Sequence, residues 1–220
     1  MSNPRPESRS LRAVIFDLGG VVLGSPLHAI ARYESSLGIP ENAINRVVMD
    51  TAPGGAWHQL ERGEIDMPSF FRGFEKECAA AGHPIDASAM FGEMAAEAKP
   101  RPAMLRAIER IKAEGLRVAA LTNNWATEES TDAPDSGTRA LASLFDEFVE
   151  SSVEGLRKPD PRIYELVCGR LGVAPQEAAF LDDIGANLKP ARSMGMTTIR
   201  VVQPEPALAE LEAALGFSLS

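Results

Sequence analysis

The sequence is poor in cysteine, lacks long apolar runs and has no excess of basic residues. Its two cysteines, Cys78 and Cys168, form no CxxC pair, so we expect free thiols rather than a disulfide framework or a cysteine metal site. No apolar run approaches the roughly 20 residues that span a bilayer. Residues 1–10 lack the apolar segment of a signal peptide. These absences predict a soluble, cytoplasmic protein.

The charge balance excludes two further classes of partner. The 220 residues include 31 acidic and 22 basic side chains, which gives a net charge of −9 at pH 7. Nucleic acids and anionic membranes are polyanions, so neither is an expected partner. An anionic small molecule would need a lysine or a bound cation to create a local positive centre.

From about residue 100 onward, short apolar runs alternate with helical patterns. Repeated strand–helix units predict an α/β fold with a parallel sheet and helices on both faces, a three-layer Rossmann-like core. The expected strands occupy residues 11–16, 116–122, 147–151, 178–181 and 197–202. The expected helices of this part occupy residues 104–114, 140–144, 161–171, 188–194 and 207–215.

Between residues 26 and 99 the pattern is helical, with three helix-breaking interruptions, at 38–40, 53–55 and 82–84. We expect about four helices there, forming a small domain of their own. The predicted organisation is a flexible tail at 1–10, a core made of 11–24 and 100–220, and a helical cap at 25–99. A polar segment at 127–139 is expected to be a solvated loop.

Polar side chains follow several predicted strands, and in a parallel sheet such points share the edge where ligands bind. Each residue alone is better explained as a helix cap, a turn former or a surface charge. Their joint position predicts a functional site. The residues are Asp17 after the first strand, Thr122 and Asn123 after the second, Asp182 and Asp183 after the fourth, and Lys158 in a proline-flanked loop.

This set of residues suits phosphoryl transfer, which needs an in-line nucleophile, a cation and donors to the phosphate oxygens. The carboxylate of Asp17 could attack phosphorus if Mg²⁺ screened the two anions from each other. Mg²⁺ prefers oxygen ligands, which Asp17, Asp183 and the backbone carbonyl of Gly19 would provide. The groups expected to hold the phosphate are Lys158, Thr122 and Asn123.

The same segments resemble the four motifs of the haloacid dehalogenase superfamily, in order. They are VIFDLGGVV at 14–22, LTNN at 121–124, RKPDP at 157–161 and FLDDIGAN at 180–187. The resemblance implies a phosphohydrolase whose catalytic residues are Asp17, Thr122, Lys158 and Asp182, and a type-one cap that closes over the site. Asn187 is expected to orient the acidic pair. Taken alone, it could instead cap the helix that follows.

Two closer resemblances are to the N-terminal phosphatase domain of animal soluble epoxide hydrolase and to the corresponding domain of some large acyl-CoA dehydrogenases. The first rests on residues 180–192 and on LTNNW at 121–125, and the second on DLGGV at 17–21. Epoxide hydrolysis belongs to a separate α/β-hydrolase domain in those proteins. Because no GxSxG or HGxP segment occurs here, that activity is not expected.

The sequence departs from the superfamily pattern at Gly19, where phosphatases usually carry a second aspartate that acts as general acid and base. Loss of such a group typically costs about 10²–10⁴-fold in rate. Alkyl phosphates, whose leaving groups need a proton, should suffer most, and acyl, aryl or sugar-1-phosphates less. Glu64 and His58 are candidates to replace the acid, although both are more readily explained as exposed helix residues.

Two other functions fit parts of the pattern. A metal-independent dehalogenase uses the same nucleophile and needs no general acid, but the adjacent Asp182 and Asp183 would then lack a cation to join them. A degenerate domain that binds phosphate without turnover would tolerate Gly19, although it need not keep Asp17.

The least readable region is the helical segment, which would set the substrate. Its aromatic residues Trp57, Phe70, Phe71 and Phe74 are expected in its own core, as are the methionines at 90–94. The expected partner is therefore only a small phosphorylated molecule, and a homodimer formed through this segment stays open.

Overall fold

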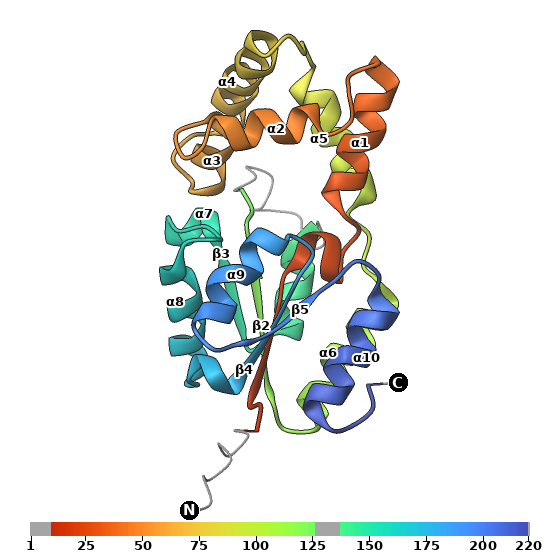
Figure 1. The fold of residues 1–220 in the computed structure, drawn as a ribbon, viewed down its shortest axis with the longest axis vertical. Coiled ribbons are helices and arrows are strands. Elements are labelled where there is room, and N and C mark those ends of the chain that lie inside the picture. The colour runs from red at the N-terminus through yellow and green to blue at the C-terminus, as the bar shows by residue number, and fades with distance from the viewer. Residues whose placement is uncertain (1–9, 126–136, 220) are drawn as a thin grey trace, which may run out of the picture.

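The computed structural model describes residues 10–125 and 137–219, so nearly all of the predicted tail at 1–10 and most of the predicted loop at 127–139 lie outside the described residues. Five parallel strands form one sheet in the order β3-β2-β1-β4-β5 (Figure 1). The predicted α/β fold is confirmed, with β1 at the centre of the sheet. The strands are β1 (Ala13–Phe16), β2 (Arg117–Thr122), β3 (Glu147–Glu150), β4 (Ala178–Asp182) and β5 (Thr197–Arg200).

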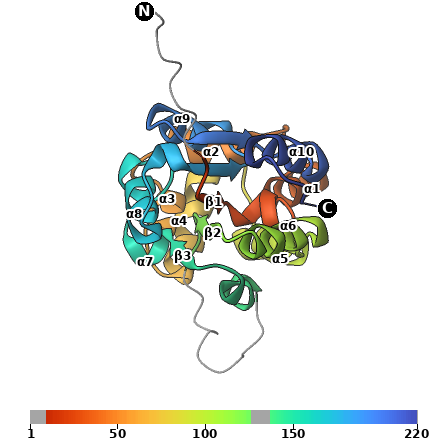
Figure 2. The same cartoon turned by 90° about the horizontal axis from the view of Figure 1, so that it is seen from below.

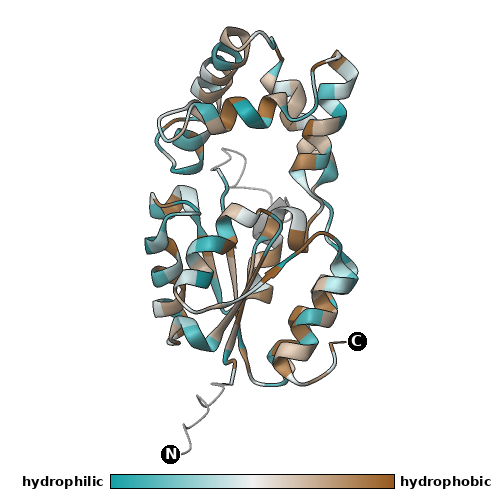
Figure 3. Cartoon of the chain, viewed as in Figure 1, coloured by the Kyte–Doolittle hydropathy of each residue, from teal (hydrophilic) through white to brown (hydrophobic). Residues whose placement is uncertain are grey.

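Helices cover both faces of the sheet (Figure 2). They are α6 (Pro102–Ala113) and α10 (Pro204–Leu215) on one face, and α8 (Pro161–Leu171) and α9 (Gly185–Ser193) on the other. Val14 and Phe16 of β1 face the first pair, whereas Ala13 and Ile15 face the second, because side chains alternate along a strand. A strand buried on both faces is apolar throughout, as Figure 3 illustrates.

Residues 26–97 form a separate group of helices beyond the carboxyl edge of the sheet, here called the insertion (Figure 1). It contains five helices where about four were predicted. The missed break lies at Gly63, whose φ of 68° is left-handed. Asp66 then starts the next helix by accepting a hydrogen bond from the Ser69 amide. The helices are α1 (Pro26–Leu37), α2 (Ala43–Asp50), α3 (Ala56–Glu61), α4 (Met67–Ala80) and α5 (Ala87–Glu97).

The insertion has its own apolar core, as predicted. Phe70, Phe74 and Met90 are fully buried, and Trp57 and Phe71 pack against them. No helix in the described part of the chain is long and apolar enough to cross a membrane.

The chain enters and leaves the insertion at one place, where two connecting segments run side by side. Leu23 pairs with Pro100 in an antiparallel bridge, and the Gly24 amide donates to the Lys99 carbonyl at 3.0 Å. A Cβ atom on Gly24 would lie 2.1 Å from the carbonyl oxygen of Glu97, so only glycine allows this close approach. The predicted limits at 25 and 99 stay a prediction, but the two connections are adjacent.

Candidate functional site

The structure brings together the polar side chains that follow the strands. Asp17 follows β1, while β2 ends with Thr122 and β4 with Asp182, and β1 lies between the other two. The Asp17 amide donates to the Leu181 carbonyl at 2.9 Å, which ties the start of the turn to β4. One carboxylate oxygen each of Asp17, Asp182 and Asp183 lies within 4.8 Å of the others. The predicted convergence of carboxylates is therefore present.

Lys158 is the positive group of this cluster. Its Nζ lies 2.9 Å from Oδ1 of Asp17 and 2.8 Å from Oδ2 of Asp182, and only 1% of its side chain is exposed. Burial alone lowers the pKa of the ammonium group, but the two carboxylates outweigh burial and raise that pKa above its usual value. Lys158 therefore stays charged while buried between two carboxylates.

Asp182 has both carboxylate oxygens occupied by donors. Besides Lys158, the Asn187 side-chain amide donates to both oxygens at 3.1 Å, and the Ile184 amide donates to Oδ1 at 2.8 Å. Asn187 contacts Asp182 and does not cap the helix, because α9 already begins at Gly185. This arrangement leaves Asp182 to hold Lys158 and gives it little capacity for another ligand.

Asp183 is the third carboxylate of the cluster, and its Oδ2 lies against the backbone of Gly20, in the turn after β1. Ser25 Oγ donates to its Oδ2 at 3.3 Å. A Cβ atom on Gly20 would lie 2.0 Å from the same oxygen, and the φ of Gly20 is 79°, so this position requires glycine. Burial, and next the charge of Asp182, raises the pKa of Asp183 to about 6.

The cluster carries more negative than positive charge. Burial raises the pKa of Asp17 well above its usual range, Lys158 opposes that rise, and Asp182 and Asp183 add to it. Among the described residues, Lys158 is the one ammonium group paired with these three carboxylates, and it pairs directly with two of them, Asp17 and Asp182. In the part of the chain that the structure describes, no other residue donates a hydrogen bond to Asp17 Oδ2 or Asp183 Oδ1. The site therefore offers open oxygens and an excess of negative charge, which are the properties that attract a divalent cation.

Asn123 has a structural task that sequence reasoning missed. Its Nδ2 donates to the Lys158 carbonyl at 3.0 Å, and its Oδ1 accepts from the Lys158 amide at 2.8 Å. The side chain thereby fixes the backbone of the loop that presents the lysine. Thr122 is buried near the cluster, and within the described part of the chain its hydroxyl makes one long contact, of 3.5 Å, with the Asn123 carbonyl. The predicted phosphate contacts of both residues stay a prediction.

The position of the missing acid is not dictated by the backbone. Gly19 has φ −64° and ψ 123°, a conformation that any residue adopts. Of the two proposed substitutes, Glu64 is exposed and forms an ion pair with Arg62 at 2.6 Å. His58 is buried, contrary to expectation, and burial followed by the charges of Arg157 and Arg62 lowers its pKa to about 4. A neutral imidazole is a weak proton donor, so neither residue replaces the acid well.

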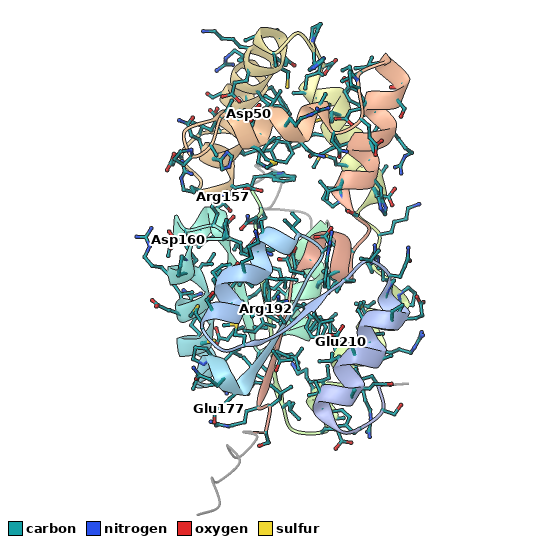
Figure 4. All side chains as sticks on the ribbon, viewed as in Figure 1. Asp50, Arg157, Asp160, Glu177, Arg192 and Glu210 are labelled. Carbon is teal, nitrogen blue, oxygen red and sulfur yellow. The ribbon has the colours of Figure 1, made fainter. Side chains whose placement is uncertain are left out.

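Two contacts between the core and the insertion were not foreseen. Trp125, directly after the second motif, reaches the insertion, where its ring centroid lies 4.8 Å from that of Phe91 and 6.4 Å from that of Trp57. Arg157 of the core forms an ion pair with Glu61 at the end of α3, with Nε and Oε2 2.6 Å apart. Figure 4 shows Arg157 between the core and α3. The one sequence signal was membership of the third motif for Arg157 and a place directly after the second motif for Trp125.

Comparison with known proteins gives an independent view of this site. The profile of the haloacid dehalogenase-like hydrolase family matches residues 11–195. Acyl-CoA dehydrogenase family member 10 of Mus musculus is 41% identical over 214 residues, which are 96% of this chain and 20% of that protein. Bifunctional epoxide hydrolase 2 of Sus scrofa is 34% identical over 224 residues, 96% of this chain and 40% of that protein.

Two further similarities cover nearly the whole of both chains. The sesquiterpene phosphatase astK of Aspergillus oryzae is 27% identical over 94% of this chain and 98% of its own length. A solved HAD-like hydrolase from Porphyromonas gingivalis has the same fold, with a TM-score of 0.64, 21% identity and coverage of 91% of this chain and 97% of that chain. The chain thus spans 20% and 40% of the two larger relatives.

Proposed function

Because the chain belongs to the haloacid dehalogenase-like hydrolase family, we propose that it is a Mg²⁺-dependent phosphatase that hydrolyses a small phosphate ester through a covalent intermediate on Asp17. The observation that carries the proposal is the buried Lys158 ammonium group between Asp17 and Asp182, with Asp183 alongside. A buried nucleophilic carboxylate next to a fixed cationic donor suits an anionic phosphate better than a neutral substrate.

The residues fit a bound magnesium ion. Asp17 and Asp183 have open oxygens, and the carbonyl of Gly19 would complete a set of hard oxygen ligands. Asp182 is left out because donors already occupy both of its oxygens. When bound, the ion would neutralise charge between the phosphate and Asp17 and would lower the raised pKa of the nucleophile.

In the proposed reaction, an Asp17 carboxylate oxygen attacks phosphorus and the bond from phosphorus to the leaving oxygen breaks. Lys158 and the Thr122 hydroxyl donate to the equatorial phosphate oxygens, where negative charge is spread in the transition state. Water then attacks the aspartyl phosphate, which releases inorganic phosphate and restores the carboxylate of Asp17. Because position 19 is glycine, the leaving oxygen must take its proton from solvent, which favours leaving groups that are stable as anions.

We further propose that the leaving group carries an apolar part. Trp57 and Phe91 of the insertion and Trp125 of the core form one aromatic cluster that joins the two parts of the molecule. A relative of similar length is a sesquiterpene phosphatase by name. An apolar group that packs against this cluster would gain up to about 0.8 kcal/mol for each buried methylene.

The test is turnover of acetyl phosphate, hexanoyl phosphate and p-nitrophenyl phosphate with Mg²⁺ and with excess EDTA. We expect turnover only with Mg²⁺, and a higher kcat/KM for hexanoyl than for acetyl phosphate. Dehalogenation of 2-chloropropionate in EDTA would instead support the metal-independent alternative. The absence of turnover with all three phosphates would refute the enzyme and leave a phosphate-binding role.

Metal removal should affect stability through Asp183. The pKa of Asp183 is raised to about 6 in the metal-free folded protein. As the pH falls, its carboxylate therefore binds a proton at a higher pH in the folded protein than in the unfolded chain. The stability contributed by this proton is lost as the pH rises through the folded pKa. Asp183→Asn mimics the neutral form, so in EDTA at pH 7 we expect it to have a higher Tm than the wild type, with a smaller difference at pH 5.

Mg²⁺ should reverse this order at pH 7. The wild-type Tm is expected to rise by about 5–10 °C at a Mg²⁺ concentration 100 times Kd, and that of Asp183→Asn to stay nearly constant. Asp160→Asn is the control, because Asp160 is a carboxylate that pairs with Arg162 outside the cluster. A wild-type Tm that does not respond to Mg²⁺ would contradict the metal site. Differential scanning fluorimetry measures these Tm values, in EDTA at pH 7 and pH 5 and with Mg²⁺ at pH 7.

A further inference from the structure

The last turn of α3 makes a bridge between the insertion and the core. Glu61 uses both of its carboxylate oxygens, since Oε1 accepts from the Trp57 indole nitrogen at 3.0 Å and Oε2 accepts from Arg157 Nε at 2.6 Å. The Glu61 side chain is 8% exposed and that of Arg157 is 20% exposed. A pair this shielded from water is screened far less than the ordinary surface ion pairs of this chain.

The core end of the bridge adjoins the reaction centre. Arg157 directly precedes Lys158, whose own backbone amide and carbonyl are fixed by the Asn123 side chain. A displacement of Arg157 therefore acts on a short backbone segment that ends at Lys158, between the two carboxylates. The insertion end of the bridge adjoins Trp57, which belongs to the aromatic cluster.

A second contact docks the same end of α3 on the core. Gly63 packs so closely on Ser152 that a Cβ atom would lie 2.3 Å from the Ser152 carbonyl oxygen. Ser152 Oγ donates to Asn124 Oδ1 at 3.0 Å, and the Asn124 amide donates to Ser151 Oγ at 3.0 Å. Asn124 lies two residues after Thr122, so this contact adjoins the other phosphate-binding segment. The end of α3 and the turn after it thus contact Arg157 directly and, through Ser152, connect to the segment that follows Thr122.

We propose that Glu61 is a positioning residue that holds α3 against the core and, through Arg157, sets the place of Lys158. The inference rests on the proposed function, in which Lys158 stabilises the transferred phosphoryl group. Trp57 donates to the same Glu61 carboxylate as Arg157. An organic group that packs against the aromatic cluster is therefore connected to Lys158 through Trp57, Glu61 and Arg157. Packing of α3 on the core and correct placement of Lys158 in the phosphate site then occur together.

The chain contains only two tryptophans, and both lie at this junction. In a Trp57→Phe background, Trp125 is the single tryptophan reporter, and among the described residues Arg157 is the one side-chain donor left to Glu61. Glu61→Gln in this background keeps an acceptor oxygen for Arg157, whereas Glu61→Ala removes it. We expect the emission of Trp125 to move to longer wavelength in Glu61→Ala and to stay at the background value in Glu61→Gln.

The kinetic arm uses p-nitrophenyl phosphate with Mg²⁺. We expect Glu61→Ala to lower kcat by about 10- to 100-fold, the cost of a small misplacement of a catalytic group. KM should change much less, and Glu61→Gln should restore kcat to the Trp57→Phe value. Glu64→Ala is the matched control, because Glu64 pairs with Arg62 within the insertion and not with the core. It should change neither emission nor kcat.

A double-mutant cycle separates positioning from general loss of stability. If Glu61 acts through Arg157, the variant with Glu61→Ala and Arg157→Gln should lose no more kcat than the worse single variant. Where Glu61→Ala fails to fold, Glu61→Gln with Trp57 intact replaces it, because the glutamine NH₂ group would then face one of the two donors. If the wild type is active but Glu61→Ala matches its background in emission and kcat, the inference is overturned. It is also overturned if the effects of Glu61→Ala and Arg157→Gln on kcat add in the double variant. An inactive wild type overturns the proposed function instead.

Discussion

Asp17→Asn is expected to abolish turnover of p-nitrophenyl phosphate, with kcat lower by on the order of 10⁴-fold or more. An amide oxygen is a far poorer nucleophile than a carboxylate, and the variant also loses the charge that pairs with Lys158 at 2.9 Å. Asparagine has nearly the same shape as aspartate and retains an oxygen for the Leu18 amide, which lies 2.7 Å from Oδ1. The fold should therefore survive the change.

The stability of this variant is part of the same prediction. The pKa of Asp17 is raised by burial, so removal of its charge relieves a cost in the metal-free protein. We expect Asp17→Asn to unfold in EDTA at pH 7 at the wild-type Tm or above it. Acid quenching of the wild type during turnover should trap phosphate on the protein, and the variant should trap none. Turnover retained by a folded Asp17→Asn would mean that water attacks phosphorus directly.

Gly19→Asp is expected to raise turnover of alkyl phosphates by about 10²–10⁴-fold, the usual contribution of a general acid. The backbone at Gly19 already suits an L-residue, with φ −64° and ψ 123°. A Cβ atom there would lie 3.3 Å from Pro26 Cδ, so Pro26 must yield by a few tenths of an ångström. The gain should be small for acetyl phosphate, whose leaving group needs no proton.

Gly19→Asn is the matched control for this gain. It adds the same bulk beside Pro26 without an acidic proton, so it should reproduce any steric loss and none of the gain. The quantity to compare is the ratio of kcat on an alkyl phosphate to kcat on acetyl phosphate for the three proteins. Equal ratios in Gly19→Asp and Gly19→Asn would indicate that another group or solvent already supplies the proton.

Most of the core could be predicted because its strands are short apolar runs that end abruptly in polar residues. The helix predicted at 161–171 has those bounds in the structure, since Pro161 starts it and Gly172 ends it in the left-handed conformation. The clustering of Asp17 and Asp182 followed from strand ends alone, because neighbouring parallel strands end at the same edge of the sheet, whereas that of Lys158 followed from its loop just before a helix.

What could not be predicted depends on distances between residues far apart in the chain. Glu61 and Arg157 are 96 residues apart, and each alone has the pattern of an exposed charge. The side chain of Asn123 holds the Lys158 backbone, a contact that depends on how two loops lie in the folded chain, and its expected contact with phosphate stays a prediction. The fifth helix was missed because a single glycine at position 63 was a weaker signal than the glycine–proline breakers.

The adjacent connections to the insertion have a consequence for how such proteins diversify. The bridge between Leu23 and Pro100 brings the two ends of the inserted segment together, so the insertion is attached to the core as one closed loop. Closing a loop of twice the length costs only about 0.6 kcal/mol more chain entropy. The segment between these ends can therefore be lengthened, shortened or exchanged for that of a relative without moving β1 or β2. Grafting a foreign insertion at this pair of residues would transplant a substrate preference, and a graft that keeps a carboxylate at the place of Glu61 would also keep the contact with Arg157.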